Sequence, residues 1–199
     1  MIKVQDLGKK YPSMWVFQSI SFEATQGEIV SIVGPNGSGK STLLKIIAGL
    51  TSPTKGKVLR PKGELNLTIG YYGLDVQLYS NLSAAEHLRY AAKLRGVPSK
   101  EELLLERVGL SSSADICTES FSTGMKVRLK LALAIQAKPK LLLLDEPEVS
   151  LDAAGRALLV NIVEEQRKHG VILWATNDLS FIKDHTYKVV LNESSSGYF

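Results

Sequence analysis

Residues 28–50 read EIVSIVGPNGSGKSTLLKIIAGL, and the motif GPNGSGKS occupies residues 34–41. An apolar, strand-like stretch precedes this motif, and leucines and isoleucines at helical spacing follow it. The glycines let the backbone turn tightly, so that successive N–H groups can point at phosphate oxygens. A glycine-rich turn without a ligand is the alternative, but the full motif between a strand and a helix favours a phosphate-binding loop (P-loop).

The P-loop predicts a site for a nucleoside triphosphate with Mg²⁺. Lys40 can reach the β- and γ-phosphates, and Ser41 can offer its hydroxyl to the metal. The helix that follows adds the positive end of its dipole. The predicted phosphate-binding residues are Gly34, Pro35, Asn36, Gly37, Ser38, Gly39, Lys40, Ser41 and Thr42.

The composition of the 199-residue chain, 44% hydrophobic and 22% charged, is typical of one domain with a substantial core. The formal net charge of +4 permits binding to anionic lipid or nucleic acid without indicating either. Cys117 is the single cysteine, so we expect a reducing compartment and no intrachain disulfide. No apolar run approaches the ~18 residues that span a bilayer, and the N-terminal sequence lacks the hydrophobic segment of a signal peptide. We therefore expect a soluble, cytoplasmic chain.

Short strand-like runs alternate with amphipathic helical runs, which predicts an α/β domain with a largely parallel sheet. We expect strands at residues 2–7, 20–24, 28–33, 69–72, 141–144, 171–175 and 188–191, and a helix at residues 41–48. Residues 83–130 lie between these sheet segments and have the pattern of a helical lobe. Two capping boxes are expected there, at the starts of helices: Ser83 with Glu86, and Ser99 with Glu102.

Residues 141–147 read LLLLDEP, an apolar strand that ends in two carboxylates. Ligands of such folds bind at the carboxyl edge of the parallel sheet. Asp145 could accept a hydrogen bond within the Mg²⁺ shell, and Glu146 could orient and deprotonate an attacking water. A solvated loop or a helix N-terminus would explain the two acids equally well on their own, but together with the P-loop they predict nucleotide hydrolysis.

From Lys3 to about Leu191 the chain resembles the nucleotide-binding subunits of ABC transporters. Residues 121–125, FSTGM, match the family signature LSGGQ, which touches the γ-phosphate bound to a second subunit. Ser122 and Gly124 are the retained residues of this signature. The resemblance implies a P-loop NTPase fold with a mainly parallel sheet core, an N-terminal antiparallel β part and an inserted α-helical lobe.

The resemblance also assigns roles to an aromatic residue and to a loop. Tyr11 matches the aromatic residue that stacks on adenine, although a half-buried edge tyrosine is an alternative. Residues 150–152 resemble the loop that contacts the opposite subunit, whereas capping of the following helix would explain Asp152 equally well.

By the same resemblance, residues 1–199 form a single nucleotide-binding domain. Its α/β core would comprise residues 1–82 and 131–199, with the helical lobe at 83–130. The lobe and residues 74–82 would form the groove that grips a membrane subunit; a simple hinge of the lobe is the alternative for residues 74–82.

Several positions depart from the family pattern near the expected γ-phosphate. The signature has Thr123 in place of glycine and Met125 in place of glutamine. Leu74 stands where the family has a glutamine, and Gln77 lies three residues late. Asn177 replaces the histidine that contacts the γ-phosphate; its amide can donate a hydrogen bond but cannot become cationic. We expect sound ATP binding and hydrolysis that is slow or dependent on a partner.

The three histidines do not fill the missing position. His87, His169 and His185 stand elsewhere in the sequence, and we expect them at the surface or at helix ends. The expected catalytic residues are therefore Lys40, Glu146 and Asn177.

The resemblance favours an ATPase subunit that powers a membrane transporter from the inner face of the membrane, paired with a second nucleotide-binding subunit as a homo- or heterodimer. The run FSTGMKVRLKLALAI favours export-type systems, and the short chain is also similar to the ATPase of cytochrome c maturation. An ATP-binding switch with little hydrolysis is the alternative, against which the retained Glu146 counts. A nucleic-acid partner is not expected, because ABC proteins of that kind carry paired domains or long coiled arms.

Overall fold

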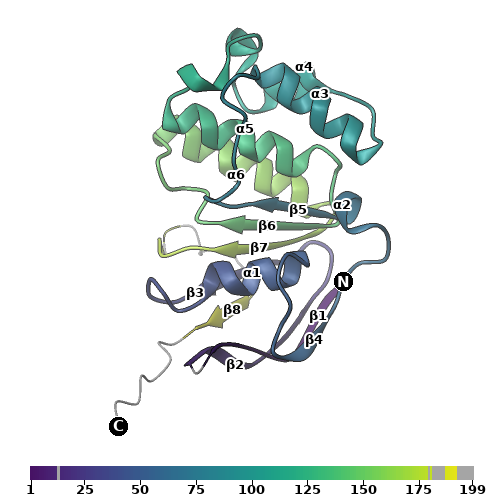
Figure 1. Cartoon of the computed structure of the whole chain (residues 1–199), viewed down its shortest axis with the longest axis vertical. Coiled ribbons are helices and arrows are strands. Elements are labelled where there is room, and N and C mark those ends of the chain that lie inside the picture. The colour runs from purple at the N-terminus through teal and green to yellow at the C-terminus, as the bar shows by residue number, and fades with distance from the viewer. Residues whose placement is uncertain (13, 179, 181–186, 192–199) are drawn as a thin grey trace.

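The computed structural model describes residues 1–12, 14–178, 180 and 187–191 (Figure 1). Along the longest axis, a helical lobe lies at one end and a small antiparallel sheet at the other, with a parallel sheet between them. This arrangement confirms the expected P-loop NTPase fold with its parallel core, antiparallel β part and helical lobe.

Each of the two sheets has one kind of strand pairing. The parallel sheet has the strand order β5-β6-β7-β3-β8, and the antiparallel sheet has the order β2-β1-β4. The parallel strands are β3 (Ile29–Val33), β5 (Ile69–Tyr72), β6 (Leu141–Asp145), β7 (Val171–Ala175) and β8 (Tyr187–Val190). The antiparallel strands are β1 (Ile2–Tyr11), β2 (Met14–Ala24) and β4 (Lys55–Leu59).

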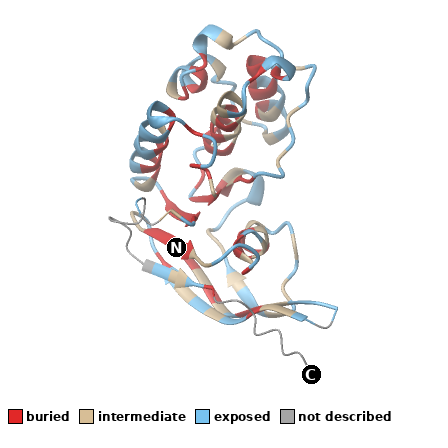
Figure 2. Ribbon diagram, turned by 90° about the vertical axis from the view of Figure 1, so that its left-hand side faces the viewer, coloured by how far each residue is buried: buried red, intermediate tan, exposed pale blue. Residues whose placement is uncertain are grey.

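Helices cover both faces of the parallel sheet. The α-helices are α1 (Lys40–Ala48), α2 (Leu65–Thr68), α3 (Ala84–Arg95), α4 (Glu101–Arg107), α5 (Thr123–Ile135) and α6 (Ala153–Arg167). Two short 3₁₀ turns, η1 (Ser111–Ser113) and η2 (Thr118–Ser120), join α4 to α5. Figure 2 shows the buried segments in the strands and on the inward sides of these helices.

The four leucines of β6 are fully buried because the strand is covered on both faces. Leu142 and Leu144 pack with Trp174 in the core shared with α3, α5 and α6. Leu141 and Leu143 point the opposite way, into the core shared with α1 and the antiparallel sheet. The alternation of side chains along a strand thus lets one apolar run serve two cores, and it brings Asp145 and Glu146 to the carboxyl edge of the sheet.

The first predicted capping box is present at the start of α3. Ser83 Oγ accepts a hydrogen bond from the Glu86 amide at 3.2 Å, and Glu86 Oε2 accepts one from the Ser83 amide at 2.8 Å. The second is wrong. Helix α4 begins at Glu101 and its N-cap is Lys100, so Ser99 lies one residue before the N-cap position and cannot form a capping box with Glu102. The Ser99 hydroxyl donates instead to the Glu101 carboxylate.

His87 lies at a helix end, as one of the two expected positions, in the first turn of α3, and its side chain is buried. Its Nε2 accepts from the Tyr79 amide at 2.9 Å, so Nδ1 carries the proton and donates to the Ser83 carbonyl oxygen at 2.8 Å. His169 is exposed just after α6, as expected. His185 lies outside the described residues.

Replacing Ser83 by alanine is expected to lower the free energy of unfolding by about 1 kcal/mol, because it removes one acceptor of the capping box. Urea denaturation followed by far-UV circular dichroism measures this change. Ser99→Ala is the matched control, since Ser99 caps no helix amide in the part of the chain described. Equal losses in the two variants would contradict the prediction.

Candidate functional site

The P-loop joins β3 to α1 in a conformation that depends on glycine. Gly37 and Gly39 have φ angles of 85° and 97°, in the left-handed region that side chains disfavour. A Cβ atom on Gly34 would lie 2.3 Å from the Leu191 carbonyl oxygen and 2.6 Å from Ser38 Oγ. The residue after β8 and the Ser38 side chain therefore leave no room for a side chain at that position.

The N-terminus of α1 opens into this loop without a competing anion. Gly39 is the N-cap residue and has no side chain with which to cap the helix. No acidic residue occupies the first turn. The first-turn N–H groups and the positive end of the helix dipole are therefore suited to a phosphate group.

A cavity of about 390 Å³ lies beside the P-loop. It brings together residues from the P-loop, the end of β6, strand β2 and the segment after β5. The lining residues are Val16, Asn36, Gly37, Gly39, Lys40, Ser41, Thr42, Leu74, Asp145 and Glu146. The two carboxylates predicted from LLLLDEP thus share one cavity with the P-loop lysine and hydroxyl groups.

Lys40 is 5% exposed, and its ammonium group is surrounded by acceptors. Its Nζ donates to the carbonyl oxygens of Gly34 at 2.9 Å and Pro35 at 3.3 Å. It also donates to Asn177 Oδ1 at 2.9 Å and lies 3.4 Å from Glu146 Oε1. A buried charge needs such partners, and a triphosphate would have to take their place.

Asn177 links the end of β7 to both the P-loop and the acidic pair. Its Nδ2 donates to Asn36 Oδ1 at 2.6 Å and to Glu146 Oε1 at 3.1 Å. Glu146 has a φ angle of 51°, which is uncommon for a residue with a side chain. The Glu146 amide donates to the Ala175 carbonyl oxygen at 2.9 Å. These contacts hold the Glu146 carboxylate beside Lys40.

Asp145 and Ser41 form the pair of oxygen ligands expected for Mg²⁺. Burial raises the pKa of the Asp145 carboxyl, and a hydrogen bond with the Ser41 side chain acts in the opposite direction. A buried carboxylate and a hydroxyl are hard oxygen donors, and Mg²⁺ is commonly held by one or two such groups together with substrate phosphates. The residues present therefore fit this metal.

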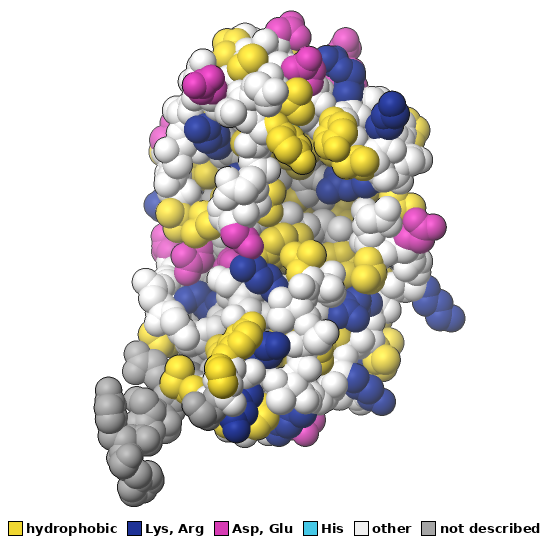
Figure 3. Space-filling model, viewed as in Figure 1, with side chains coloured by type: hydrophobic (Ala, Val, Ile, Leu, Met, Phe, Trp, Pro, Cys, Tyr) yellow, Lys and Arg dark blue, Asp and Glu magenta, His cyan; other side chains and the backbone are white. Residues whose placement is uncertain are grey.

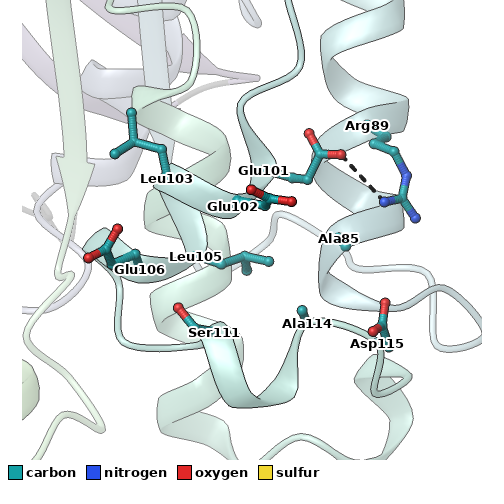
Figure 4. A pocket seen from close by; sticks show the side chains of 10 residues that line it. All are labelled: Ala85, Arg89, Glu101, Glu102, Leu103, Leu105, Glu106, Ser111, Ala114 and Asp115. Atoms are coloured by element: carbon teal, nitrogen blue, oxygen red, sulfur yellow. Dashed lines mark hydrogen bonds and ion pairs between the residues drawn. The ribbon is translucent and has the colours of Figure 1, made fainter.

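A larger cavity, of about 610 Å³, lies in the helical lobe between α3, α4 and η1 (Figure 4). Among the described residues, four carboxylates line it, from Glu101, Glu102, Glu106 and Asp115. Arg89 is the single basic residue in this described lining and already pairs with Glu101 at 3.4 Å. The net negative lining would repel a triphosphate, so the smaller cavity at the P-loop is the better nucleotide site.

The family model for ABC transporters matches residues 17–149, more than half of the chain. The chain belongs to the ABC transporter family. One relative is the lantibiotic transport ATP-binding protein SrtF of Streptococcus pyogenes, 33% identical over 190 residues that cover 93% of this chain and 83% of SrtF. Another is the uncharacterized ABC transporter ATP-binding protein YxlF of Bacillus subtilis (strain 168), 38% identical over 186 residues. That match covers 90% of this chain, and the chain spans 63% of the length of YxlF.

Solved ABC structures have the same fold. An ATP-binding subunit of an ABC transporter superposes with a TM-score of 0.87 at 29% identity, covering 97% of this chain and 88% of that subunit. A bacterial ABC transporter cassette solved as a dimer superposes with a TM-score of 0.83 at 25% identity, covering 96% of this chain and 94% of the cassette. No helix formed by the described residues is both long and apolar enough to cross a membrane.

The ABC signature lies at the start of α5, away from the P-loop cavity. Ser122 is the N-cap of α5, and its Oγ accepts from the Met125 amide at 3.2 Å. A Cβ atom on Gly124 would lie 3.5 Å from the Ser150 carbonyl oxygen, so the signature adjoins the loop at residues 150–152. None of these signature residues is among the described residues that line the cavity.

The other residues predicted by resemblance have separate locations. Tyr11 ends β1, is 49% exposed and lies with its ring centroid 4.6 Å from Lys9 Nζ; it does not line the cavity formed by the described residues. Asp152 caps α6 through a hydrogen bond from the Gly155 amide at 2.7 Å. Leu74, at the position where the resemblance predicts a glutamine, lines the cavity.

Sequence reasoning missed two residues near the site. Val16 on β2 lines the cavity, and a Cβ atom on Gly39 would lie 2.4 Å from its Cγ1. Glu148 is buried behind the acidic pair, where Trp174 and Thr176 donate to it. The available signal for Glu148 was the pair Trp174 and Thr176 at the end of the apolar run of β7. A buried indole N–H and a buried hydroxyl each need an acceptor, and a nearby carboxylate can supply it.

Replacing Lys40 by alanine is expected to weaken MgATP binding by about a hundredfold or more, because charge-assisted contacts with the phosphates are lost. Isothermal titration calorimetry measures the affinity. Lys57→Ala, which removes an exposed lysine on β4, is the control. Parental affinity in Lys40→Ala would contradict the P-loop assignment.

Proposed function

We propose that this chain is the MgATP-hydrolysing subunit of a membrane transporter, and that it works by ATP-dependent head-to-tail dimerisation. The observation that carries the proposal is one cavity lined by Lys40, Ser41, Asp145 and Glu146 beside an uncapped helix N-terminus. These are the groups that phosphoryl transfer to water requires: a phosphate cradle, a metal site and a base.

Hydrolysis would use the residues in distinct roles. Lys40 and the P-loop amides hold the β- and γ-phosphates, and Asn177 donates its amide to the γ-phosphate. Glu146 accepts the proton of the attacking water. Mg²⁺, held by Ser41 and Asp145, would neutralise charge that develops on the phosphates. Because Lys40 and Asn177 both contact Glu146 in this structure, phosphate binding must draw them away to free the base.

The position of the signature supports a dimer. Ser122 and Gly124 lie at the start of α5 and, within the described part of the chain, do not reach the P-loop cavity. A helix N-terminus that does not line its own nucleotide site could complete the site of a second subunit. A homodimer would place Thr123 and Asn177 at both sites, whereas a heterodimer would combine this Glu146 with another signature.

The surface of the helical lobe supports a membrane partner. Exposed hydrophobic side chains occur along residues 74–82 and α3, at Leu74, Tyr79, Tyr90 and Leu94. Figure 3 shows hydrophobic side chains gathered on the lobe. The rings of Tyr79 and Tyr90 meet edge to face, with centroids 6.0 Å apart. We propose that this surface receives the membrane subunit and holds the chain at the inner face of the membrane.

Residues 74–82 also connect this surface to the signature. Thr118 donates its hydroxyl to the Tyr79 carbonyl oxygen at 2.9 Å and its amide to the Leu82 carbonyl oxygen at 3.0 Å. The Glu119 amide donates to the Ser80 carbonyl oxygen at 3.0 Å. Since η2 immediately precedes the signature, a shift of residues 74–82 would move Ser122 as well. A hinge of the lobe remains the competing interpretation of this segment.

We also propose that hydrolysis by this chain is slow. Leu74 lines the cavity with an apolar side chain that cannot bind a metal-bound water. Thr123 adds a side chain at the start of the signature helix, and Asn177 cannot supply a cation. If these three positions abolish turnover altogether, the chain would be an ATP-binding switch that dimerises on nucleotide; measurement of turnover decides between the two functions.

Replacing Glu146 by glutamine is expected to leave MgATP binding intact and to lower kcat by about a hundredfold, because the amide cannot accept the proton of water. The variant should accumulate as an ATP-bound dimer. Steady-state phosphate release and size-exclusion chromatography with light scattering measure both effects. Glu23→Gln, at an exposed carboxylate on β2, is the control. Parental turnover in Glu146→Gln would assign the base to another group.

Replacing Asn177 by histidine is expected to raise kcat by about three- to tenfold, because the γ-phosphate gains a cationic donor. Asn177→Ala, which offers no donor, should lower it. Phosphate release at saturating MgATP measures both variants. An unchanged kcat in Asn177→His would mean that the amide suffices or that another step limits the rate.

A further inference from the structure

Glu148 is a buried carboxylate to which no step of hydrolysis has been assigned. It is 4% exposed and lies three residues beyond the end of β6. Its Oε2 accepts from Trp174 Nε1 at 2.9 Å, and its Oε1 accepts from the Thr176 hydroxyl. Both carboxylate oxygens are therefore bonded to groups at the end of β7.

These bonds fix the backbone on both sides of Asn177. The Thr176 hydroxyl donates to Glu148 and accepts from the Asp178 amide at 2.9 Å. The Thr176 amide donates to the Ile32 carbonyl oxygen at 3.2 Å. Residues 176–178 are thus held in a tight turn, and the Asn177 side chain extends from it to Lys40 and Glu146.

Glu148 also belongs to the loop that carries Glu146. Within this loop the Val149 amide donates to the Glu146 carbonyl oxygen, and the Leu151 amide donates to the Glu148 carbonyl oxygen, both at 3.3 Å. One buried carboxylate therefore joins the loop after β6 to the turn after β7. A cavity of about 460 Å³ lies at this junction, and Glu146, Glu148 and Asn177 all line it.

We propose that Glu148 is a positioning residue for ATP hydrolysis, which holds the backbone turn at residues 176–178 so that the Asn177 amide can reach the γ-phosphate next to Glu146. The inference rests on the proposed function, because it presumes that Glu146 and Asn177 act on the γ-phosphate and its attacking water. Glu148 is not among the described residues that line the P-loop cavity, so we assign it an action through other groups. A loss of alignment at Asn177 would therefore slow chemistry without weakening binding.

The first test compares three variants. Glu148→Leu removes the carboxylate that accepts from Trp174 and Thr176 and is expected to lower kcat about tenfold, with KM for ATP changed less than about twofold. Glu148→Gln is expected to restore most of this loss, because its amide oxygen can accept from Trp174 and its NH₂ group can donate to Thr176.

Gln166→Leu is the matched control for a merely structural role. Gln166 is also 4% exposed, and its Nε2 donates to the Pro139 carbonyl oxygen at 2.6 Å, at the opposite edge of the sheet. This variant loses a buried hydrogen bond of similar kind and should keep the parental kcat. Equal losses of kcat in Glu148→Leu and Gln166→Leu, or no loss in Glu148→Leu, would overturn the proposal.

A second measurement reads the contact directly. The indole N–H resonance of Trp174, assigned by its absence in Trp174→Phe, should shift when MgATP binds to the Glu146→Gln variant. The additional change Glu148→Leu should abolish that shift, whereas the resonance of Trp15 on β2 should still respond. A Trp174 shift that persists without Glu148 would overturn the proposal.

A pair of variants at Thr176 tests the proposal if Glu148→Leu does not fold. Thr176→Val removes the hydroxyl that Glu148 holds, and Thr176→Ser keeps it. The proposal expects about a tenfold lower kcat in Thr176→Val and near-parental kcat in Thr176→Ser. If the two variants turn over equally, the proposal is wrong. If the parent chain shows no turnover above the Glu146→Gln blank, the proposed function fails instead. The Trp174 resonance then decides on its own whether nucleotide binding is felt at β7 through Glu148.

Discussion

The buried ammonium group of Lys40 is the constraint on which the site depends. A charge that is 5% exposed must be surrounded by acceptors, and here they come from three separate parts of the chain. The carbonyl oxygens of Gly34 and Pro35 follow β3, Glu146 follows β6, and Asn177 follows β7. These strands are neighbours in the order β6-β7-β3. The sheet order thus determines which side chains can meet around the lysine.

The features that could be predicted from the sequence are those that depend on residues close together in the chain. Strands β5 and β7 lie at the predicted residues, because their apolar runs are bounded by polar residues or glycine. The P-loop and the acids after β6 could be recognised because motif and strand are contiguous in sequence. Strand β4 and helix α2 were missed. Strand β4 reads KGKVL, with no apolar alternation, and it pairs with β1 through backbone hydrogen bonds that a residue pattern does not reveal.

The features that were not predicted have a different cause, since each depends on partners that are separated along the sequence or on an exact helix start. His87 is buried because the segment before α3 folds back over it and supplies the Tyr79 amide. Ser99 fails as a cap because α4 starts at Glu101, later than its sequence suggests. Glu148 was missed because its partners, Trp174 and Thr176, lie on β7 and directly after it, far along the chain. For His87 and Glu148, only the tertiary fold decides that the polar group is buried.

The hydrogen bonds around His87 have a mechanical consequence for the lobe. The ring donates through Nδ1 to Ser83 at the start of α3 and accepts through Nε2 from the Tyr79 amide, so sliding residues 74–82 along α3 would break the Tyr79 bond to a buried ring. Thr118 adds a second connection, from residues 74–82 to the segment that precedes the signature. A displacement of Tyr79 would therefore be transmitted through these hydrogen bonds to the segment before the signature, and would not be absorbed by a flexible hinge. The distance that a membrane subunit moves this tyrosine would then set the distance that the signature travels.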